Sequence, residues 1–483
     1  MITRENFVQV EPFAYEIPAS FRADMRVPAR VYADEMLLEM AAHDRSLEQL
    51  VNTATLPGVV RYTLAMPDIH QGYGPPIGAV IPIDPNDGGI ISPGATGYDI
   101  NCGVRLLRTT LTLADVQPQL DQLVDALYAD IPTGVGRGGD VRLSEQEMDE
   151  VLTEGARWVI RAHFGNRDDL AYIEAEGALP GARAGAVSTG AKQRGRDQLG
   201  TLGSGNHFVE IGRVSEIFHP QAAQVFGLEI DQLVVWIHTG SRGMGHQVAT
   251  DYISRFQTTV QDYGIVLPDR ELVCAPFHST PGQEYFAAMA AAANFAFANR
   301  QLLTERIRRT FEYVLRGKVP STALELVYDV THNIVKRETY LIAGQPREIL
   351  VHRKGATRAF APGNQEIPPA YRAVGQPVLV PGNMGSASYV LVGALGAMEK
   401  TFGSACHGAG RAMSRHAALK DTGGQDLKQR LRQQGIHVRG SARGLAEETP
   451  EAYKDVDRVV EVVHQSGLAE KVARVVPVGV IKG

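Results

Sequence analysis

Glycine-rich loops occur along almost the whole chain, and short apolar segments and helical stretches alternate between them. The chain has 50 glycines among its 483 residues. They cluster at residues 77–97, 134–139, 203–205, 240–245 and 382–385. Glycine permits positive φ and lets the backbone approach a ligand closely, and no repeat or linker separates these loops. The sequence therefore predicts a mixed α/β (α+β) fold in which residues 1–483 form a single large catalytic unit with glycine-rich active-site loops.

Hydrophobic periodicity locates the helices and strands. Apolar residues recur with a helical period over residues 32–43 and 114–130, and residues 283–316 form the longest helical run. Ser144 and Glu147 have the spacing of a capping box, which predicts the start of another helix. Short runs rich in β-branched residues predict strands. These strands are expected at residues 59–64, 233–238, 323–330, 348–351 and 377–380.

Composition excludes some classes of protein. The net charge of −6 excludes a uniformly basic surface, so a nucleic-acid partner would need a local basic region. No apolar run of about 18 residues occurs and no signal-peptide pattern is seen, so neither a transmembrane helix nor membrane attachment is expected. Cys102, Cys274 and Cys406 form no CxxC pair, which predicts a cytoplasmic protein without a disulfide framework.

Several potential metal ligands stand at strand ends or in glycine-bounded turns. Asp99 and Cys102 lie in GYDINCGVRLLRT, His207 lies in GSGNHFVE, His238 ends VVWIH, and His332 follows LELVYDV. Imidazole, thiolate and carboxylate together suit a transition metal such as Mn, Fe or Zn. The alternatives are histidines with structural hydrogen bonds and a cysteine that is simply a buried small side chain.

Two further segments contain candidate reactive residues. Asp68 and His70 lie in MPDIHQGYGPPIG, an expected loop, where the pair could bind a metal, position a nucleophile or cap a turn. His407 lies among small residues in SACHGAGR, with Arg411 as a nearby cation. An imidazole can attack phosphorus and form a phosphoramidate. Alone, this segment could equally be a helix start with a buried histidine.

The common nucleotide-binding motifs are absent. The sequence contains no Lys-x-Asp-Gly, no P-loop and no GxSxG elbow. Gly134, Gly136 and Gly139 match GxGxxG, but they follow a helix-like stretch where the dinucleotide motif requires a strand. This loop is either a backbone nest that could hold phosphate or a flexible turn.

Eight motifs in series resemble the RtcB family of RNA ligases, over a region from MPDIHQGYG to Lys482. They are GYDINCGVR, GSGNHFVE, IHTGSRGMGH, YDVTHN, HRKGATRAF, PGNMGSASYVL, SACHGAGR and VGVIKG. The resemblance implies an RtcB-like fold and a GTP-dependent RNA ligase with two Mn²⁺ ions. Such an enzyme joins RNA 2′,3′-cyclic phosphate or 3′-phosphate ends to 5′-hydroxyl ends through a histidine–GMP intermediate, in RNA repair or tRNA splicing. The need for an archease-type activator stays open.

The resemblance also implies roles for individual residues. Asp99, Cys102 and His207 match the ligands of one Mn²⁺. Cys102, His238 and His332 match those of the other, with Cys102 bridging, and His407 matches the guanylylated histidine. The implied GTP site comprises Asn206, His207, Phe208, Val209, Glu210, His332, Asn333, Pro381, Gly382, Asn383, Met384, Ser388, His407, Gly408, Ala409, Gly410, Tyr453 and Lys482. Asn383 departs from the serine of the family pattern.

A local basic surface is expected to guide the RNA. TGAKQRGRDQ is the first candidate segment and HRKGATR the second, and the alternative for each is a solvated charged loop. Asp68 matches a family position near the RNA-end chemistry. The candidate RNA-binding residues are Asp68, Lys192, Arg194, Arg196, Arg353, Lys354, Arg358 and Arg411.

Two other functions would fit parts of this sequence. A two-metal phosphoesterase could use the same ligands, but it would tolerate replacement of His407. A non-catalytic RNA-binding protein would tolerate loss of Cys102.

Overall fold

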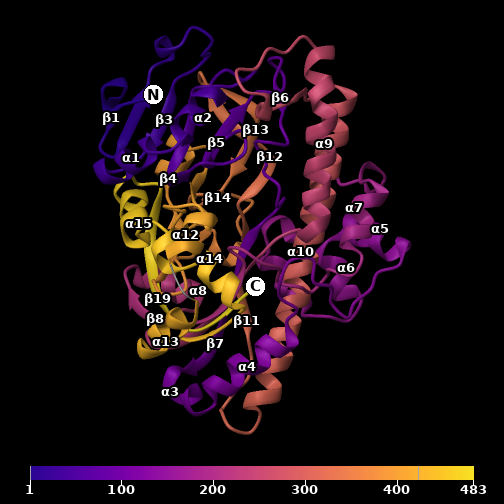
Figure 1. The fold of residues 1–483 in the computed structure, drawn as a ribbon, viewed down its shortest axis with the longest axis vertical. Helices are drawn as coiled ribbons and strands as arrows, with labels where there is room; N and C mark the ends of the chain where they lie inside the picture. The colour runs from indigo at the N-terminus through magenta and orange to yellow at the C-terminus, as the bar shows by residue number, and fades with distance from the viewer. Residues whose placement is uncertain (1, 422–423) are drawn as a thin grey trace.

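The computed structural model describes residues 2–421 and 424–483. Within them, the strands form two large sheets and two small strand pairs, flanked by helices (Figure 1). The first sheet has the order β1-β2-β3-β4-β5-β13-β12. Its strands are β1 (Val8–Glu11), β2 (Ala14–Ile17), β3 (Ala29–Tyr32), β4 (Thr63–His70), β5 (Ile77–Ile83), β13 (Gln345–Lys354) and β12 (Asn333–Ile342).

The second sheet has the order β11-β7-β9-β8-β19-β16-β15, and β18 pairs with β19 beside it. Its strands are β11 (Glu325–Thr331), β7 (Gly103–Thr112), β9 (Gln232–Thr239), β8 (Phe208–Ile217), β19 (Ala469–Lys482), β16 (Ser388–Gly393), β15 (Pro377–Val380) and β18 (His437–Arg439). The small pairs are β6 (Ile90–Ile91) with β10 (Ala275–Pro276), and β14 (Ala356–Arg358) with β17 (Ser404–Cys406). The mixed α/β prediction is confirmed.

A long helix runs along one side of the molecule in Figure 1, beside α9 (Arg242–Asp262). This helix, α10 (Thr280–Leu315), packs against α4, α5, α6 and α9. Residues 287–298 are all buried and mostly alanine, so neighbouring elements approach it from every side. The other helices are α1 (Glu35–Ala42), α2 (Ser46–Thr53), α3 (Leu113–Val116), α4 (Leu120–Asp130), α5 (Glu145–Glu154), α6 (Ala156–Arg161), α7 (Thr189–Gly195), α8 (Pro220–Phe226), α11 (Leu395–Lys400), α12 (Arg415–Asp421), α13 (Gly424–Gln433), α14 (Ala442–Glu447) and α15 (Val456–Gln465).

Most of the predicted elements are present, and one strand is displaced. The capping box is confirmed: Ser144 N donates to Glu147 Oε2 at 2.8 Å and Glu147 N to Ser144 Oγ at 3.2 Å. The strand expected at 59–64 was wrong, because positive φ angles of 75° at Gly58 and 58° at Arg61 interrupt the extended chain. The strand begins at Thr63 instead and ends at His70, so it includes the first part of the segment predicted as a loop.

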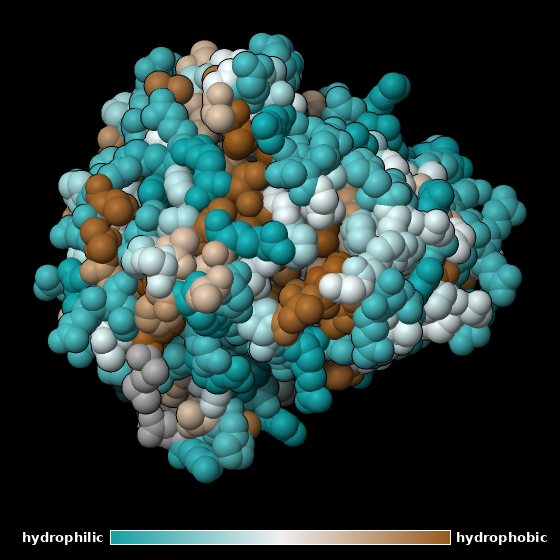
Figure 2. All heavy atoms as spheres, turned by 90° about the horizontal axis from the view of Figure 1, so that it is seen from above, coloured by the Kyte–Doolittle hydropathy of each residue, from teal (hydrophilic) through white to brown (hydrophobic). Residues whose placement is uncertain are grey.

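Polar residues cover much of the surface. Figure 2 shows one end of the molecule, where hydrophilic residues predominate and hydrophobic residues form small groups between them. Among the described residues, no helix combines the length and apolar character that crossing a membrane requires.

Candidate active site

Four potential metal ligands lie at one edge of the second sheet. His332 directly follows β11, Cys102 directly precedes β7, His238 lies near the end of β9, and His207 directly precedes β8. Neighbouring strands are antiparallel, so the starts of β7 and β8 meet the ends of β11 and β9. The register pairs Thr331 with Gly103, Val104 with His238, and His238 with Phe208. The sheet therefore brings together residues that are far apart in the sequence.

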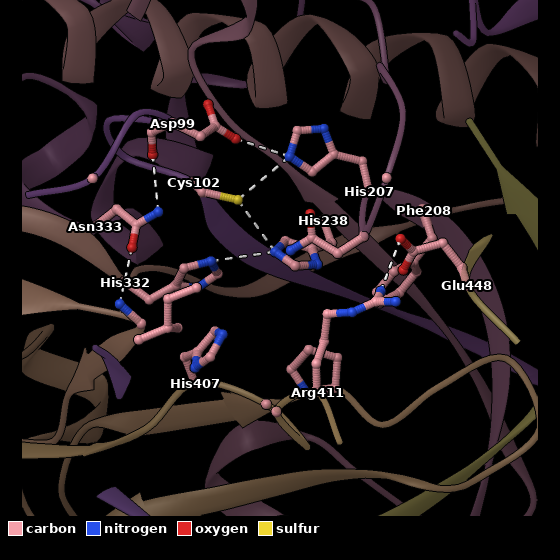
Figure 3. A pocket seen from close by; sticks show the side chains of 18 of the residues that line it. Asp99, Cys102, His207, Phe208, His238, His332, Asn333, His407, Arg411 and Glu448 are labelled. Carbon is pink, nitrogen blue, oxygen red and sulfur yellow. Dashed lines mark hydrogen bonds and ion pairs between the residues drawn. The ribbon is translucent and has the colours of Figure 1, made fainter. Parts of the chain in front are cut away.

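These side chains converge on Cys102 (Figure 3). Its Sγ lies 3.4 Å from His207 Nε2 and 3.3 Å from His238 Nε2. His238 Nε2 lies 3.3 Å from His332 Nε2, and His207 Nε2 lies 2.9 Å from Asp99 Oδ2. The ligand atoms form two groups, each within 4.8 Å, and Cys102 belongs to both. This arrangement could hold two cations with a thiolate between them.

Burial controls the protonation of this cluster. It lowers the pKa of His238 and His332 well below the usual value, so both imidazoles are neutral and can act as ligands. His207 Nδ1 lies 3.0 Å from Leu202 O, which places its proton on Nδ1 and leaves Nε2 free to coordinate. Burial and nearby Asp99 raise the pKa of the Cys102 thiol, so a bound cation would displace its proton.

A buried arginine on α10 supports the turn that carries Asp99 and Cys102. Arg300 Nη1 donates to Asn101 O at 2.9 Å and to Thr239 O at 3.0 Å. Its Nε and Nη2 donate to the two carboxylate oxygens of Asp329 at 2.8 and 2.9 Å. Asn101 has a positive φ of 53°, a conformation that costs free energy for a non-glycine residue. Arg300 therefore connects the turn before β7 to the end of β9.

The first sheet and its neighbours contribute the candidate nucleophile. His407 follows β17, and its Nδ1 lies 2.6 Å from Oδ2 of Asp68 on β4. The same carboxylate oxygen accepts from the His407 backbone N–H at 3.1 Å. The rings of His407 and His332 have centroids 4.9 Å apart. Asp68 is fully buried, so its position suits orienting His407. The predicted role near the RNA-end chemistry stays a prediction.

A cavity of about 480 Å³ joins these groups. The residues of the predicted GTP site that line it are Asn206, His207, Phe208, Glu210, His332, Asn333, Pro381, Gly382, Asn383, Met384, His407, Gly408, Ala409, Gly410, Tyr453 and Lys482. Two predicted residues do not line it. Val209 is buried in a core cluster because side chains alternate between the faces of β8. Ser388 is also buried, and its Oγ accepts from Gly382 N at 3.1 Å, so it supports the loop from behind.

Glu210 is a buried carboxyl in the wall of this cavity. Burial raises its pKa to about 8, against the opposing effect of nearby Lys482. Its Oε1 has no hydrogen-bond partner within the described part of the chain. An unpaired buried carboxyl oxygen is costly, so this atom is suited to accept from a bound ligand.

A second buried carboxylate, Glu448, was missed by sequence reasoning. Its Oε1 accepts from Arg411 at 3.1 Å and from Arg415 at 3.0 Å, and the Tyr453 hydroxyl also contacts it. Lys482 Nζ lies 3.8 Å from Oε2. Glu448 directly follows α14, and no sequence pattern marks it. It holds the Arg411 cation in place beside the cavity.

The candidate RNA-binding segments have different environments. Arg194 and Arg196 on and after α7 are exposed, while Lys192 pairs with Asp149 at 2.7 Å. The HRKGATR segment differs from the predicted surface, because each of its cations is buried against a partner on a neighbouring strand or loop. Those contacts are Arg353 with Glu338 at 2.6 Å, Lys354 with the carbonyls of Tyr73 and Pro75, and Arg358 with Glu366 at 2.6 Å and Glu174 at 3.3 Å.

Two glycine-containing loops have distinct roles. The 134–139 loop does not line the cavity, and its Gly134 N and Gly139 N already donate to backbone carbonyls at 2.8 and 2.6 Å. In the 382–385 loop, Asn383 Oδ1 accepts from Gly385 N at 2.9 Å. The residue that departs from the family pattern therefore stabilises its own turn.

Comparison with known proteins places the chain in a family. Residues 49–483 match the family model described as tRNA-splicing ligase RtcB. The chain is 52% identical over 476 residues to a tRNA-splicing ligase RtcB of Thermococcus kodakarensis, covering 98% of both chains. It is also 52% identical over 438 residues to an RNA-splicing ligase RtcB of Mycobacterium tuberculosis, covering 90% of this chain and 100% of the relative. The chain therefore belongs to the RtcB family of tRNA-splicing ligases, which are RNA ligases.

Proposed function

We propose that this protein joins RNA 2′,3′-cyclic phosphate or 3′-phosphate ends to 5′-hydroxyl ends by forming a covalent GMP intermediate on His407. One observation carries the proposal: Asp68 holds Nδ1 of His407 beside the buried Asp99, Cys102 and histidine cluster. A proton kept on Nδ1 leaves the Nε2 lone pair free for attack on phosphorus.

The donor set suits two Mn²⁺ ions. One group supplies Asp99, Cys102 and His207, and the other supplies Cys102, His238 and His332. Imidazole, thiolate and carboxylate are ligands for borderline divalent metals. Bound ions would neutralise the triphosphate and polarise the α-phosphorus.

GTP would be selected by Glu210 in the wall of the cavity. Glu210 can accept from guanine N1–H and the 2-amino group, two donors that adenine lacks at these positions. Arg411, held by Glu448, can stabilise negative charge that develops on the phosphates. His407 Nε2 then forms a bond to the α-phosphorus, the bond to pyrophosphate breaks, and the enzyme keeps GMP.

The RNA steps would use the same covalent GMP. Water opens a 2′,3′-cyclic phosphate to a 3′-phosphate, whose oxygen attacks the His407-bound phosphorus and takes GMP from the histidine. The 5′-hydroxyl oxygen of the second strand then attacks the RNA phosphorus. GMP leaves, a proton is released and a phosphodiester forms. An archease-type protein could accelerate these steps, and assays with and without it would show the dependence.

Labelling with α-³²P-GTP and Mn²⁺ tests the proposal. The wild-type protein should retain label that is lost in acid and survives alkali, as expected of a phosphoramidate, and His407→Ala should not. His278→Ala is a matched control, since His278 is exposed and outside the cavity. Absence of label in a protein that still binds metal would reject the ligase mechanism and favour the two-metal phosphoesterase.

A further inference from the structure

Three aromatic side chains form a cluster beside the metal-ligand candidates. The rings of Tyr73 and Tyr98 have centroids 5.4 Å apart in an edge-on arrangement. The ring of His246 stacks on Tyr98 with centroids 5.9 Å apart and an interplanar angle of 22°. All three line the cavity, and Tyr98 directly precedes Asp99. None belongs to the residues assigned above to GTP, metal or nucleophile.

This aromatic platform (Tyr73, Tyr98 and His246) is backed by the protein interior. Both tyrosines pack against a hydrophobic core cluster, yet each is only partly buried, and His246 is exposed. The Tyr73 backbone carbonyl is held by buried Lys354. Within the described residues, neither tyrosine hydroxyl nor the His246 ring has a hydrogen-bond partner. The two tyrosine rings are therefore supported by core packing, and the polar atoms of all three rings are available to a ligand.

Two arginines, Arg242 and Arg194, lie near the His246 end of the platform. His246 lies one helical turn after Arg242 on α9, and both line the cavity. Gln247, the next residue, accepts from Nη1 of Arg194 on α7 at 2.9 Å. Arg194 is exposed, so a solvent-accessible positive charge stands beside the helical turn that carries His246.

We propose that Tyr73, Tyr98 and His246 form a stacking platform for the nucleobase at an RNA end, with Arg194 contacting the adjoining phosphate backbone. The inference rests on the proposed ligase function. While GMP is bound to His407, the wall around Glu210, Tyr453 and Lys482 holds guanine, so the RNA must approach from another side. Aromatic side chains stack on any base, which suits an enzyme that accepts ends of varied sequence.

Fluorescence of 2-aminopurine tests stacking directly. One oligoribonucleotide carries 2-aminopurine at a 3′-phosphate end, and a second carries it at a 5′-hydroxyl end, so the two arms identify which end occupies the platform. Binding of the matching strand to the Mn²⁺-loaded protein should quench the fluorescence. Tyr73→Leu and Tyr98→Leu should remove the quenching and weaken binding roughly five- to a hundred-fold. The corresponding Phe substitutions should retain the quenching, because the ring remains.

An abasic end completes a thermodynamic cycle. Removing the terminal base should weaken binding to the wild type by a similar factor and have little further effect on the Leu variants. Tyr313→Leu is the matched control, since Tyr313 is 83% exposed and outside the cavity, and circular dichroism checks folding. Three results would overturn the platform. The losses caused by the abasic end and by the Leu substitutions could prove additive, the Leu variants could bind RNA as the wild type does, or they could lose affinity for GTP and keep their affinity for RNA. Failure of the ligase function itself would show separately, as wild-type protein that takes no label from GTP.

Discussion

Asp68 Oδ2 lies 2.6 Å from Nδ1 of His407 and also accepts from the His407 backbone N–H at 3.1 Å. Two contacts to one carboxylate oxygen fix both the position of the histidine and the location of its proton. The carboxylate also stabilises a positively charged imidazole, should one form during transfer.

Asp68→Asn should therefore slow guanylylation of His407 by roughly 10²- to 10⁴-fold, because an amide can favour the wrong tautomer and carries no charge. GTP binding should change much less, since Asp68 does not itself line the cavity. Rapid-quench measurement of label transfer, with titration of GTP, separates the two effects. Asp87→Asn is the control because Asp87 is exposed. A full rate for Asp68→Asn would refute the positioning role.

Cys102 is the one residue that belongs to both ligand groups, so its loss should affect both metals. We expect Cys102→Ser to lower the Mn²⁺ stoichiometry from two to one or none, and to abolish the thiolate-to-metal charge-transfer band of the Co²⁺-substituted protein. Cys274→Ala should retain both signals, because Cys274 lies in a hydrophobic core cluster. Metal analysis after gel filtration gives the stoichiometry. Two tightly bound ions in Cys102→Ser would contradict the bridging role.

Glu210 should couple GTP binding to proton release. Its pKa of about 8 means that the carboxyl is protonated in the free protein at pH 7. Guanine donors stabilise the carboxylate and lower this pKa in the complex, so binding releases close to one proton at pH 7. The affinity for GTP should then rise with pH and level off above about 8.

Calorimetry in buffers of different ionisation enthalpy measures this proton directly. The release should disappear in Glu210→Gln and persist in Glu216→Gln, an exposed position on the same strand. Proton uptake, or a release that survives in Glu210→Gln, would show that Glu210 does not contact guanine as a carboxylate.

Arg300→Met should destabilise the protein by about 3–5 kcal/mol, the usual cost of removing one partner from a buried ion pair. Variants that still fold should bind metal more weakly, because Asn101 and Thr239 lose the donor that joins them. Arg309→Met, at an exposed position on the same helix, should change stability by less than about 0.5 kcal/mol. Urea unfolding and Mn²⁺ titration measure the two effects. Normal metal affinity in a destabilised Arg300→Met would limit Arg300 to a structural role.

The ends of the apolar strands were the most predictable part of the site. The strand at 377–380 has the bounds that the sequence predicts, and the candidate ligands at the ends of β9 and β11 lie together. The structure also explains one of the predicted glycine-rich loops. Gly240 has no room for a side chain, because a Cβ there would lie 2.4 Å from Asp99 Oδ1. Local pattern was sufficient because strand ends and tight turns are local features.

Long-range pairing was not predictable from local pattern. Arg353 carries the same charge as an exposed arginine, but its buried partner Glu338 lies on the neighbouring strand. Glu448 contacts several cavity residues, yet its own segment has no distinguishing motif. Val209 follows cavity residues in the chain and still faces the opposite side of the sheet. Each of these outcomes depends on which strands become neighbours.

The four candidate ligands stand at the ends of neighbouring strands of the second sheet. Strand pairing therefore sets the distances between them. Adjacent strands lie about 4.8 Å apart, so the pitch of the sheet, and not the length of any loop, sets how far His332, Cys102, His238 and His207 stand from one another. A slip of one residue in β7 would turn its side chains to the other face and disrupt both ligand groups together. Metal binding by this cluster would therefore be gained or lost as a whole, because a single hydrogen-bond register sets the positions of all four candidate ligands.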